Sequence, residues 1–316
     1  MNDLSVASAE TGTGGVLVTG AGGALGSVLV RVLREMHAPV SGFVSLQGPA
    51  PELGPQVQLA RVDLTDPRTY QQAVKSLAPR VIIHAAAIAK PAQALREPEL
   101  ARAVNVDATA SLTELSHALG ARFIYISTDM VFDGESAPYR ETSATEPGTY
   151  YGRTKLEAEC HVLTHPQNLV VRLPLLYGLP EVAREPGFFE QMLRALETDQ
   201  PLHLFEDEVR TPLWLEDAAR ACSRLAFSEL TGVIHVAGPE RLSRLAMGQK
   251  LAAAIGCKHA KLVATQRAQY PSSEARPHDL SLDTTRYYTH FGMPAGLAMD
   301  IALPLVLARS PRRFLS

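Results

Sequence analysis

The stretch VLVTGAGGALG, residues 16–26, decides the fold of this 316-residue chain. It begins with a short apolar run that predicts a buried strand. A glycine-rich turn follows at once, with Gly20, Gly23 and Gly26 spaced three apart, and the apolar run 28–33 then predicts a helix. Glycine permits a tight turn and a close backbone approach, and a helix start offers free N–H groups to phosphates. The stretch therefore predicts a pyrophosphate-binding turn at a strand–helix junction.

Apolar strand patterns alternate with helical patterns along the first half of the chain. Strands are predicted at 16–19, 39–45, 57–64, 80–84, 122–127 and 169–173, and helices at 28–33, 98–119 and 149–163. Strands that are apolar on both faces and separated by helices form a parallel sheet covered on both sides. The expected fold is therefore α/β, a Rossmann-type doubly wound parallel sheet.

The pattern loosens after residue 174. Helices are predicted at 188–196, 215–227 and 245–255, with extended segments at 202–205 and 232–236. We therefore expect a flexible tail over 1–14 and a dinucleotide-binding domain over 15–174. Residues 175–316 are expected to form mainly a smaller α/β substrate-binding lobe, interwoven with the first domain.

Composition excludes several classes of protein. A formal net charge of −3 without a basic run argues against nucleic acid as a partner. No apolar run approaches the roughly 20 residues of a membrane span, and the first residues lack the basic and apolar regions of a secretory signal. The three cysteines are widely spaced and form neither a metal motif nor a disulfide framework. We expect a reduced, cytoplasmic protein without a metal, acting on a small-molecule substrate.

The second strand bears on the choice of cofactor. It ends in the sequence FVSLQ, residues 43–47, with no acid to hold the ribose hydroxyls. The missing carboxylate near Ser45 favours NADP(H), with NAD(H) as the alternative, although this loop contains no arginine to grip a 2′-phosphate. Asp63, at the end of the third strand, is a candidate for the adenine edge and equally for a turn or helix cap.

A tyrosine and a lysine stand four residues apart in the predicted helix 149–163. Tyr151 and Lys155 therefore share one helical face, where an ammonium group favours the phenolate and would lower the tyrosine pKa. Such a tyrosine is a good proton donor to a carbonyl oxygen. Thr128 ends an earlier strand, where ligands of open α/β sheets bind, and its hydroxyl is suited to hold the same carbonyl.

Together these segments resemble the extended short-chain dehydrogenase/reductases. The matching segments are VTGAGGALG (18–26), VDL (62–64), HAAA (84–87), NVDAT (105–109), ISTDMVFDG (126–134), YYGRTKLEAE (150–159), VRLPLLYG (171–178), RTPLWLEDAA (210–219) and RPHDLSLD (276–283). Within that family the chain resembles the dTDP-4-dehydrorhamnose reductase branch, which includes the methionine adenosyltransferase regulatory β subunit.

The resemblance implies an NAD(P)-dependent oxidoreductase that reduces a nucleotide-linked 4-keto-6-deoxy sugar. It implies that Tyr151 is the general acid, that Lys155 holds the nicotinamide ribose and that Thr128 orients the carbonyl. The expected cofactor contacts, besides Tyr151 and Lys155, are Gly20, Gly23, Ala24, Leu25, Gly26, Ser45, Asp63, Leu64, Ala85, Ala86, Ala87 and Asn105. The expected substrate contacts are Thr128, Asp129, Met130, Arg210 and Arg276. Relatives are often dimers, so a homodimer is a further expectation.

Other activities of the same family stay open. Sugar-nucleotide dehydratases carry an acid after the Thr-Asp pair, but here Met130 follows, and a thioether cannot abstract a proton. Epimerisation, oxidoreduction of another ketone, and a non-catalytic role as a cofactor-binding regulatory subunit remain as alternatives.

Overall fold

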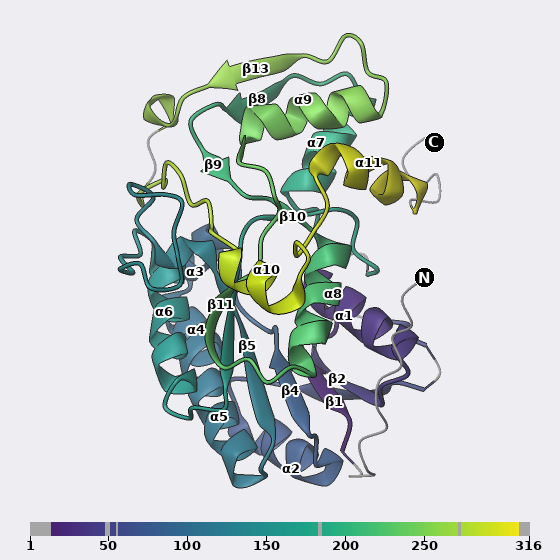
Figure 1. The fold of residues 1–316 in the computed structure, drawn as a ribbon, viewed down its shortest axis with the longest axis vertical. Coiled ribbons are helices and arrows are strands. Elements are labelled where there is room, and N and C mark those ends of the chain that lie inside the picture. The colour runs from purple at the N-terminus through teal and green to yellow at the C-terminus, as the bar shows by residue number, and fades with distance from the viewer. Residues whose placement is uncertain (1–13, 48–50, 55, 183–184, 271–272, 310–316) are drawn as a thin grey trace.

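A seven-stranded parallel sheet forms the centre of the protein, in the order β11-β6-β5-β4-β1-β2-β3 (Figure 1). The computed structural model describes residues 14–47, 51–54, 56–182, 185–270 and 273–309, so almost all of the expected tail lies outside it. The strands are β1 (Val16–Thr19), β2 (Val40–Ser45), β3 (Gln58–Val62), β4 (Val81–His84), β5 (Arg122–Thr128), β6 (Leu169–Leu173) and β11 (Gly232–His235). The predicted Rossmann-type fold is confirmed.

Helices cover both faces of this sheet (Figure 1). One face carries α1 (Ala24–Glu35) and α8 (Leu215–Ala226), and the other carries α2 (Pro67–Leu77), α5 (Ala108–Ala118) and α6 (Tyr150–Val162). Successive side chains of a strand point to opposite faces. Val16 and Val18 accordingly join the core under α1, whereas Leu17 joins the core under α2 and α5. Both faces are buried, which explains the continuous apolar runs.

The strand order reverses at β1, which lies between β4 and β2. In open α/β sheets the ligand crevice lies beyond the carboxyl ends of the strands at such a switch point. The glycine turn leaves β1 there, and the segment Ala85–Ala87 leaves β4 beside it. The topology thus places the predicted pyrophosphate turn where a dinucleotide is expected.

A smaller lobe lies beyond this edge of the sheet (Figure 1). It contains α7 (Phe188–Glu197), α9 (Arg244–Ala254), α11 (Met299–Ala308) and the parallel pair β8 (Leu202–Phe205) and β13 (Leu262–Thr265). Two-residue strands connect it to the sheet region: β7 (Leu176–Tyr177) pairs with β10 (Leu213–Trp214), and β9 (Val209–Arg210) with β12 (Leu242–Ser243). Helix α10 (Thr285–Phe291) contacts β11.

The helices between β3 and β5 differ from expectation. Helix α2 was not predicted, although Asp66 caps its N-terminus by accepting a hydrogen bond from Arg68 N at 3.0 Å. The predicted helix 98–119 is α4 (Pro98–Arg102), a π-helical turn (Ala103–Asp107) and α5, and α3 (Pro91–Arg96) precedes it. Among the described residues, no helix is both long and apolar enough to cross a membrane.

Candidate active site

The glycine turn is built for a close approach between backbone segments. Gly20 has φ +68°, and a Cβ atom there would lie 2.8 Å from the Cα of Ala86. A Cβ atom on Gly26 would lie 2.1 Å from the carbonyl oxygen of Gly20, so α1 begins directly against the turn. Gly23 caps α1 without a side chain, and the first helical turn has no acid. Its amides therefore suit a diphosphate, and the turn fits a nicotinamide dinucleotide.

A buried hydrogen-bond network fixes the opposite wall of the crevice. His84 Nδ1 lies 2.7 Å from Thr19 Oγ1, which accepts a hydrogen bond from Ala86 N at 3.2 Å. His84 Nε2 lies 3.0 Å from Thr109 Oγ1. Burial lowers the pKa of His84 to about 3, so this imidazole stays neutral and serves as a fixed link. The segment Ala85–Ala87 is thereby held against Gly20.

An arginine of β3, which sequence reasoning missed, reaches the end of β2. Arg61 Nη1 donates hydrogen bonds to the carbonyl oxygens of Ser45 at 3.2 Å and Leu46 at 3.0 Å. Arg61 belongs to β3, where it pairs in register with Val44. The loop after β2 contributes no arginine, as expected, but the neighbouring strand does. Asp63 lies in a turn, where its Oδ1 accepts hydrogen bonds from Thr65.

The chain brings Thr128 and Tyr151 together through a close backbone contact. Thr128 ends β5, and Tyr151 is the second residue of α6, whose cap Thr149 accepts a hydrogen bond from Gly152 N at 3.0 Å. A Cβ atom on Gly152 would lie 2.2 Å from the carbonyl oxygen of Met130, so only glycine allows α6 this close to the turn after β5. The Thr128 side chain lies close enough to Tyr151 to affect the pKa of its phenol.

Burial dominates the electrostatics of the tyrosine and the lysine. Burial raises the pKa of Tyr151, as does the charge of Asp129, and the neighbouring Thr128 side chain opposes this shift. Burial also lowers the pKa of Lys155 to about 7, although Glu159 opposes this shift. The Lys155 ammonium lies 4.0 Å from the ring centroid of Tyr125. In the protein alone, burial therefore outweighs the expected lowering of the tyrosine pKa, and Tyr151 is a protonated phenol at neutral pH. The lowering by Lys155 together with a nicotinamide cation stays a prediction.

A buried ion pair behind Lys155 was also missed from the sequence. Arg172 of β6 donates to both carboxylate oxygens of Glu159, from Nε at 3.0 Å and from Nη2 at 2.7 Å. Ser127 donates to the same carboxylate. Glu159 lies one helical turn after Lys155 on α6, so the pair fixes the helix face that carries the lysine. No local sequence signal marks it, because its partners come from three elements.

Asn105 lies behind the site and ties two of its elements together. Its Oδ1 accepts from Ile88 N at 2.8 Å, and its Nδ2 donates to Ile88 O at 3.2 Å and to Thr154 Oγ1 at 3.0 Å. Ile88 belongs to the loop after β4, and Thr154 to α6. These contacts make Asn105 a positioning residue.

On the substrate side, Arg210 reaches the turn that follows Thr128. Its Nε lies 3.6 Å from Asp129 Oδ2, and both side chains are buried. Burial raises the pKa of Asp129, which Arg210 and the hydrogen bond from Thr128 oppose. Met130 packs against Tyr151. The smaller lobe therefore meets the catalytic candidates through an arginine–carboxylate contact.

Arg276 lies apart from that contact. Its Nη1 lies 3.0 Å from Glu208 Oε1, its guanidinium lies 4.9 Å from the ring centroid of Phe205, and its side chain is 42% exposed. The buried Glu208 also faces Arg244, at 3.4 Å from Nε to Oε2. The structure thus places Arg276 at the rim and Arg244, which sequence reasoning missed, farther inside.

Comparison with known proteins gives the family. The sequence model described as the RmlD substrate binding domain matches residues 14–300. The chain belongs to this family. Among curated relatives, the methionine adenosyltransferase 2 subunit beta of Bos taurus is 30% identical over 284 residues, which cover 87% of this chain and 81% of the relative. The probable low-salt glycan biosynthesis reductase Agl14 of Haloferax volcanii is 30% identical over 278 residues, covering 87% and 91%.

Solved structures of the RmlD type have the same fold. A dTDP-4-dehydrorhamnose reductase from Bacillus anthracis, solved in complex with NADP, superposes with a TM-score of 0.79 at 24% identity. The match covers 93% of this chain and 99% of that one. The resemblance to the dTDP-4-dehydrorhamnose reductase branch of the extended short-chain dehydrogenase/reductases is confirmed.

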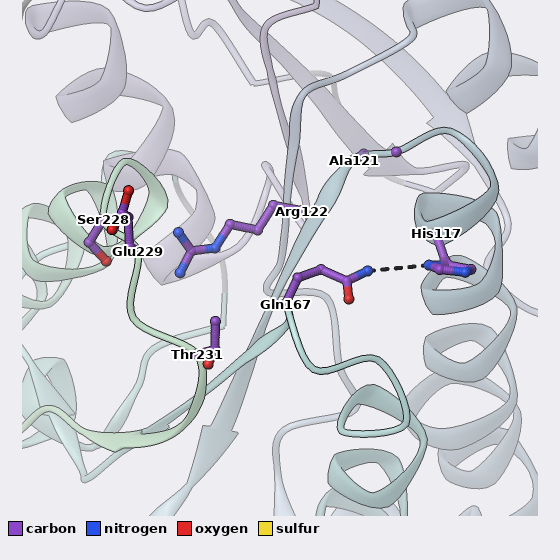
Figure 2. Close-up of a pocket in the computed structure, with 8 residues that line it drawn as sticks. His117, Ala121, Arg122, Gln167, Ser228, Glu229 and Thr231 are labelled. Atoms are coloured by element: carbon purple, nitrogen blue, oxygen red, sulfur yellow. Dashed lines mark hydrogen bonds between the residues drawn. The ribbon is translucent and has the colours of Figure 1, made fainter.

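A depression of about 600 Å³ lies at the other end of this RmlD-type sheet (Figure 2). Arg122 at the start of β5 and Thr231 just before β11 line it, and Gln167 there lies 3.3 Å from the His117 ring. Thr128 ends β5, so the length of that strand separates the depression from the candidate active site. In the described part of the chain, no group of three or more histidine, cysteine, aspartate or glutamate side chains is arranged to hold a metal.

Proposed function

We propose that the protein is an NAD(P)H-dependent reductase of a nucleotide-linked 4-keto-6-deoxy sugar. One observation carries this proposal: the set Thr128, Tyr151 and Lys155 is complete and buried, at the sheet edge where the glycine turn lies. Arg210 of the smaller lobe lies beside Asp129, in the turn that follows Thr128, and a guanidinium there is suited to a phosphate-bearing substrate.

The side chains divide the reduction between them. A bound nicotinamide dinucleotide supplies the hydride that reaches the carbonyl carbon. Tyr151, protonated at neutral pH, gives its phenolic proton to the carbonyl oxygen, and the Thr128 hydroxyl orients that oxygen. Lys155 lies one helical turn after Tyr151 and is suited to hold the nicotinamide ribose. The carbonyl thus gains one hydride and one proton and becomes an alcohol.

We favour NADP(H) over NAD(H) as the cofactor. The end of β2 carries no acid to repel a 2′-phosphate, and Arg61 lies there with its guanidinium on the carbonyl oxygens of Ser45 and Leu46. Proteins of the same fold bind either cofactor: the Bacillus anthracis structure holds NADP, and that of the Bordetella bronchiseptica enzyme WbmH holds NAD+. A cytoplasmic location stays an expectation, and so does a homodimeric assembly.

A second candidate is a non-catalytic subunit that binds a nicotinamide cofactor. The observation that favours it is the 30% identity to the methionine adenosyltransferase 2 subunit beta, over 87% of this chain. That relative is named as a subunit of a larger enzyme. On this reading Tyr151 and Lys155 serve cofactor binding alone. Epimerisation on a tightly held NAD is a further alternative within the same fold.

One experiment separates these functions. NADPH and NADH oxidation is followed with a panel of dTDP- and UDP-linked 4-keto-6-deoxy sugars, for the wild type and for Tyr151→Phe. We expect turnover with at least one sugar and a 100- to 10,000-fold lower rate in the variant, with cofactor binding kept. No turnover with any sugar, together with stable binding to a methionine adenosyltransferase catalytic subunit, would establish the second candidate instead.

A further inference from the structure

A second buried arginine lies on the substrate side of the site. Arg244 begins α9, and its side chain is only 16% exposed. Its guanidinium lies 4.4 Å from the ring centroid of Phe188 of α7, which holds one face of the group. Its Nη1 atom is buried and has no hydrogen-bond partner among the described residues. A buried donor without a partner is costly, so its persistence needs an explanation.

The charges around Arg244 are unbalanced. Burial and the neighbouring Arg210 lower the pKa of Arg244 to about 10, while Glu208 and Asp129 oppose that shift. Glu208 is divided between Arg244, at 3.4 Å, and Arg276, at 3.0 Å. Asp129, the other carboxylate, lies 3.6 Å from Nε of Arg210. Three arginines thus share two carboxylates, and two of the arginines are buried close enough to repel each other.

We propose that Arg244 and Arg210 together bind the diphosphate of the substrate, with Nη1 of Arg244 as one of the donors. This inference rests on the proposed function and adds a residue to it. A dianionic group between two guanidinium groups gives each of them a charge-assisted partner. Arg210 lies beside Asp129 and Thr128, whereas Arg244 lies toward Phe188. The diphosphate therefore lies on the smaller-lobe side of Asp129, with the sugar directed to Tyr151. Arg276 is left to hold Glu208.

The test measures binding of dTDP and UDP by calorimetry, with full-length protein and saturating NADP. Arg244→Gln should weaken the tighter of the two at least tenfold, or about 1.4 kcal/mol. Arg244→Lys should recover only part of the loss, because an ammonium lacks the two-donor fork. The matched control is Arg194→Gln on α7, which removes the same charge from an exposed side chain and should leave binding unchanged. NADP affinity should stay the same in all variants.

The melting temperature distinguishes a binding role from a structural one. Without nucleotide, Arg244→Gln should melt at or above the wild-type temperature, because it relieves repulsion from Arg210 and leaves Glu208 paired with Arg276. A lower melting temperature with unchanged dTDP and UDP affinity would assign Arg244 to the framework and overturn the proposal. Wild-type-like binding in Arg244→Gln but lost binding in Arg210→Gln would also overturn it, while the proposed function stands. If the wild type binds neither nucleotide, the proposed function itself falls.

Discussion

Replacing Lys155 by methionine is expected to stabilise the protein at neutral pH, although it removes a residue proposed for catalysis. Burial lowers the pKa of this lysine from its ordinary value of 10.5 to about 7. The folded state therefore binds fewer protons than the unfolded state between these two values. Stability must then rise with pH through that window, and the full cost applies below pH 7. At about 1.4 kcal/mol per pH unit, burying the charged lysine costs on the order of 5 kcal/mol.

The assay is urea unfolding of the wild type and of Lys155→Met at pH 5, 6, 7, 8 and 9, without cofactor. The free energy of unfolding of the wild type should gain about 2 kcal/mol relative to the variant between pH 7 and 9. Between pH 5 and 6 the difference should stay constant, because the lysine is charged in both states. Parallel curves over the whole range would refute the reasoning and show that Lys155 keeps an ordinary pKa in the folded protein.

Two further variants test the close contact at α6 and the cofactor choice. Gly152→Ala places a Cβ atom 2.2 Å from the carbonyl oxygen of Met130, so we expect a loss of about 1–3 kcal/mol in unfolding free energy and a larger loss of turnover as Tyr151 shifts. Gly187→Ala is the control, since its Cβ atom meets nothing closer than 3.6 Å, and equal effects in both would contradict the contact. Arg61→Gln should weaken NADPH binding about three- to tenfold and spare NADH, as titration of both cofactors will show. An equal loss of affinity for NADPH and NADH would show that Arg61 does not contact the 2′-phosphate.

The sequence predicted those parts of the site that depend on local patterns. The turn at Gly20, the strand end at Thr128 and the helix from Tyr151 to Lys155 each carry their signal within a few residues. The sheet edge then brings them together, because all strands of the sheet are parallel. The order of the strands, with β1 between β4 and β2, came from the structure.

Contacts that depend on strand register and on tertiary packing could not be predicted from the sequence. Arg61 of β3 reaches the end of β2 only because it pairs in register with Val44 of that neighbouring strand. Arg244 and Glu208 meet only after β12 pairs with β9. The sign of the tyrosine pKa shift depends on burial, which a helical spacing does not reveal. Sequence spacing thus indicated which side chains share one face of a helix, but not how deeply these side chains are buried from solvent.

Strand β11 and helix α8 come from the second half of the chain but complete the sheet region of the first half. The chain leaves the sheet after β6, returns as α8 and β11, and leaves again for α9. A fragment that ended at Pro174 would uncover the edge of β6 and the face of α1 that α8 protects. Neither lobe is therefore a detachable module. Because several connections cross between the lobes, small sliding movements fit this connectivity better than a free hinge. A change in a connecting segment would then affect both the substrate side and the completion of the sheet.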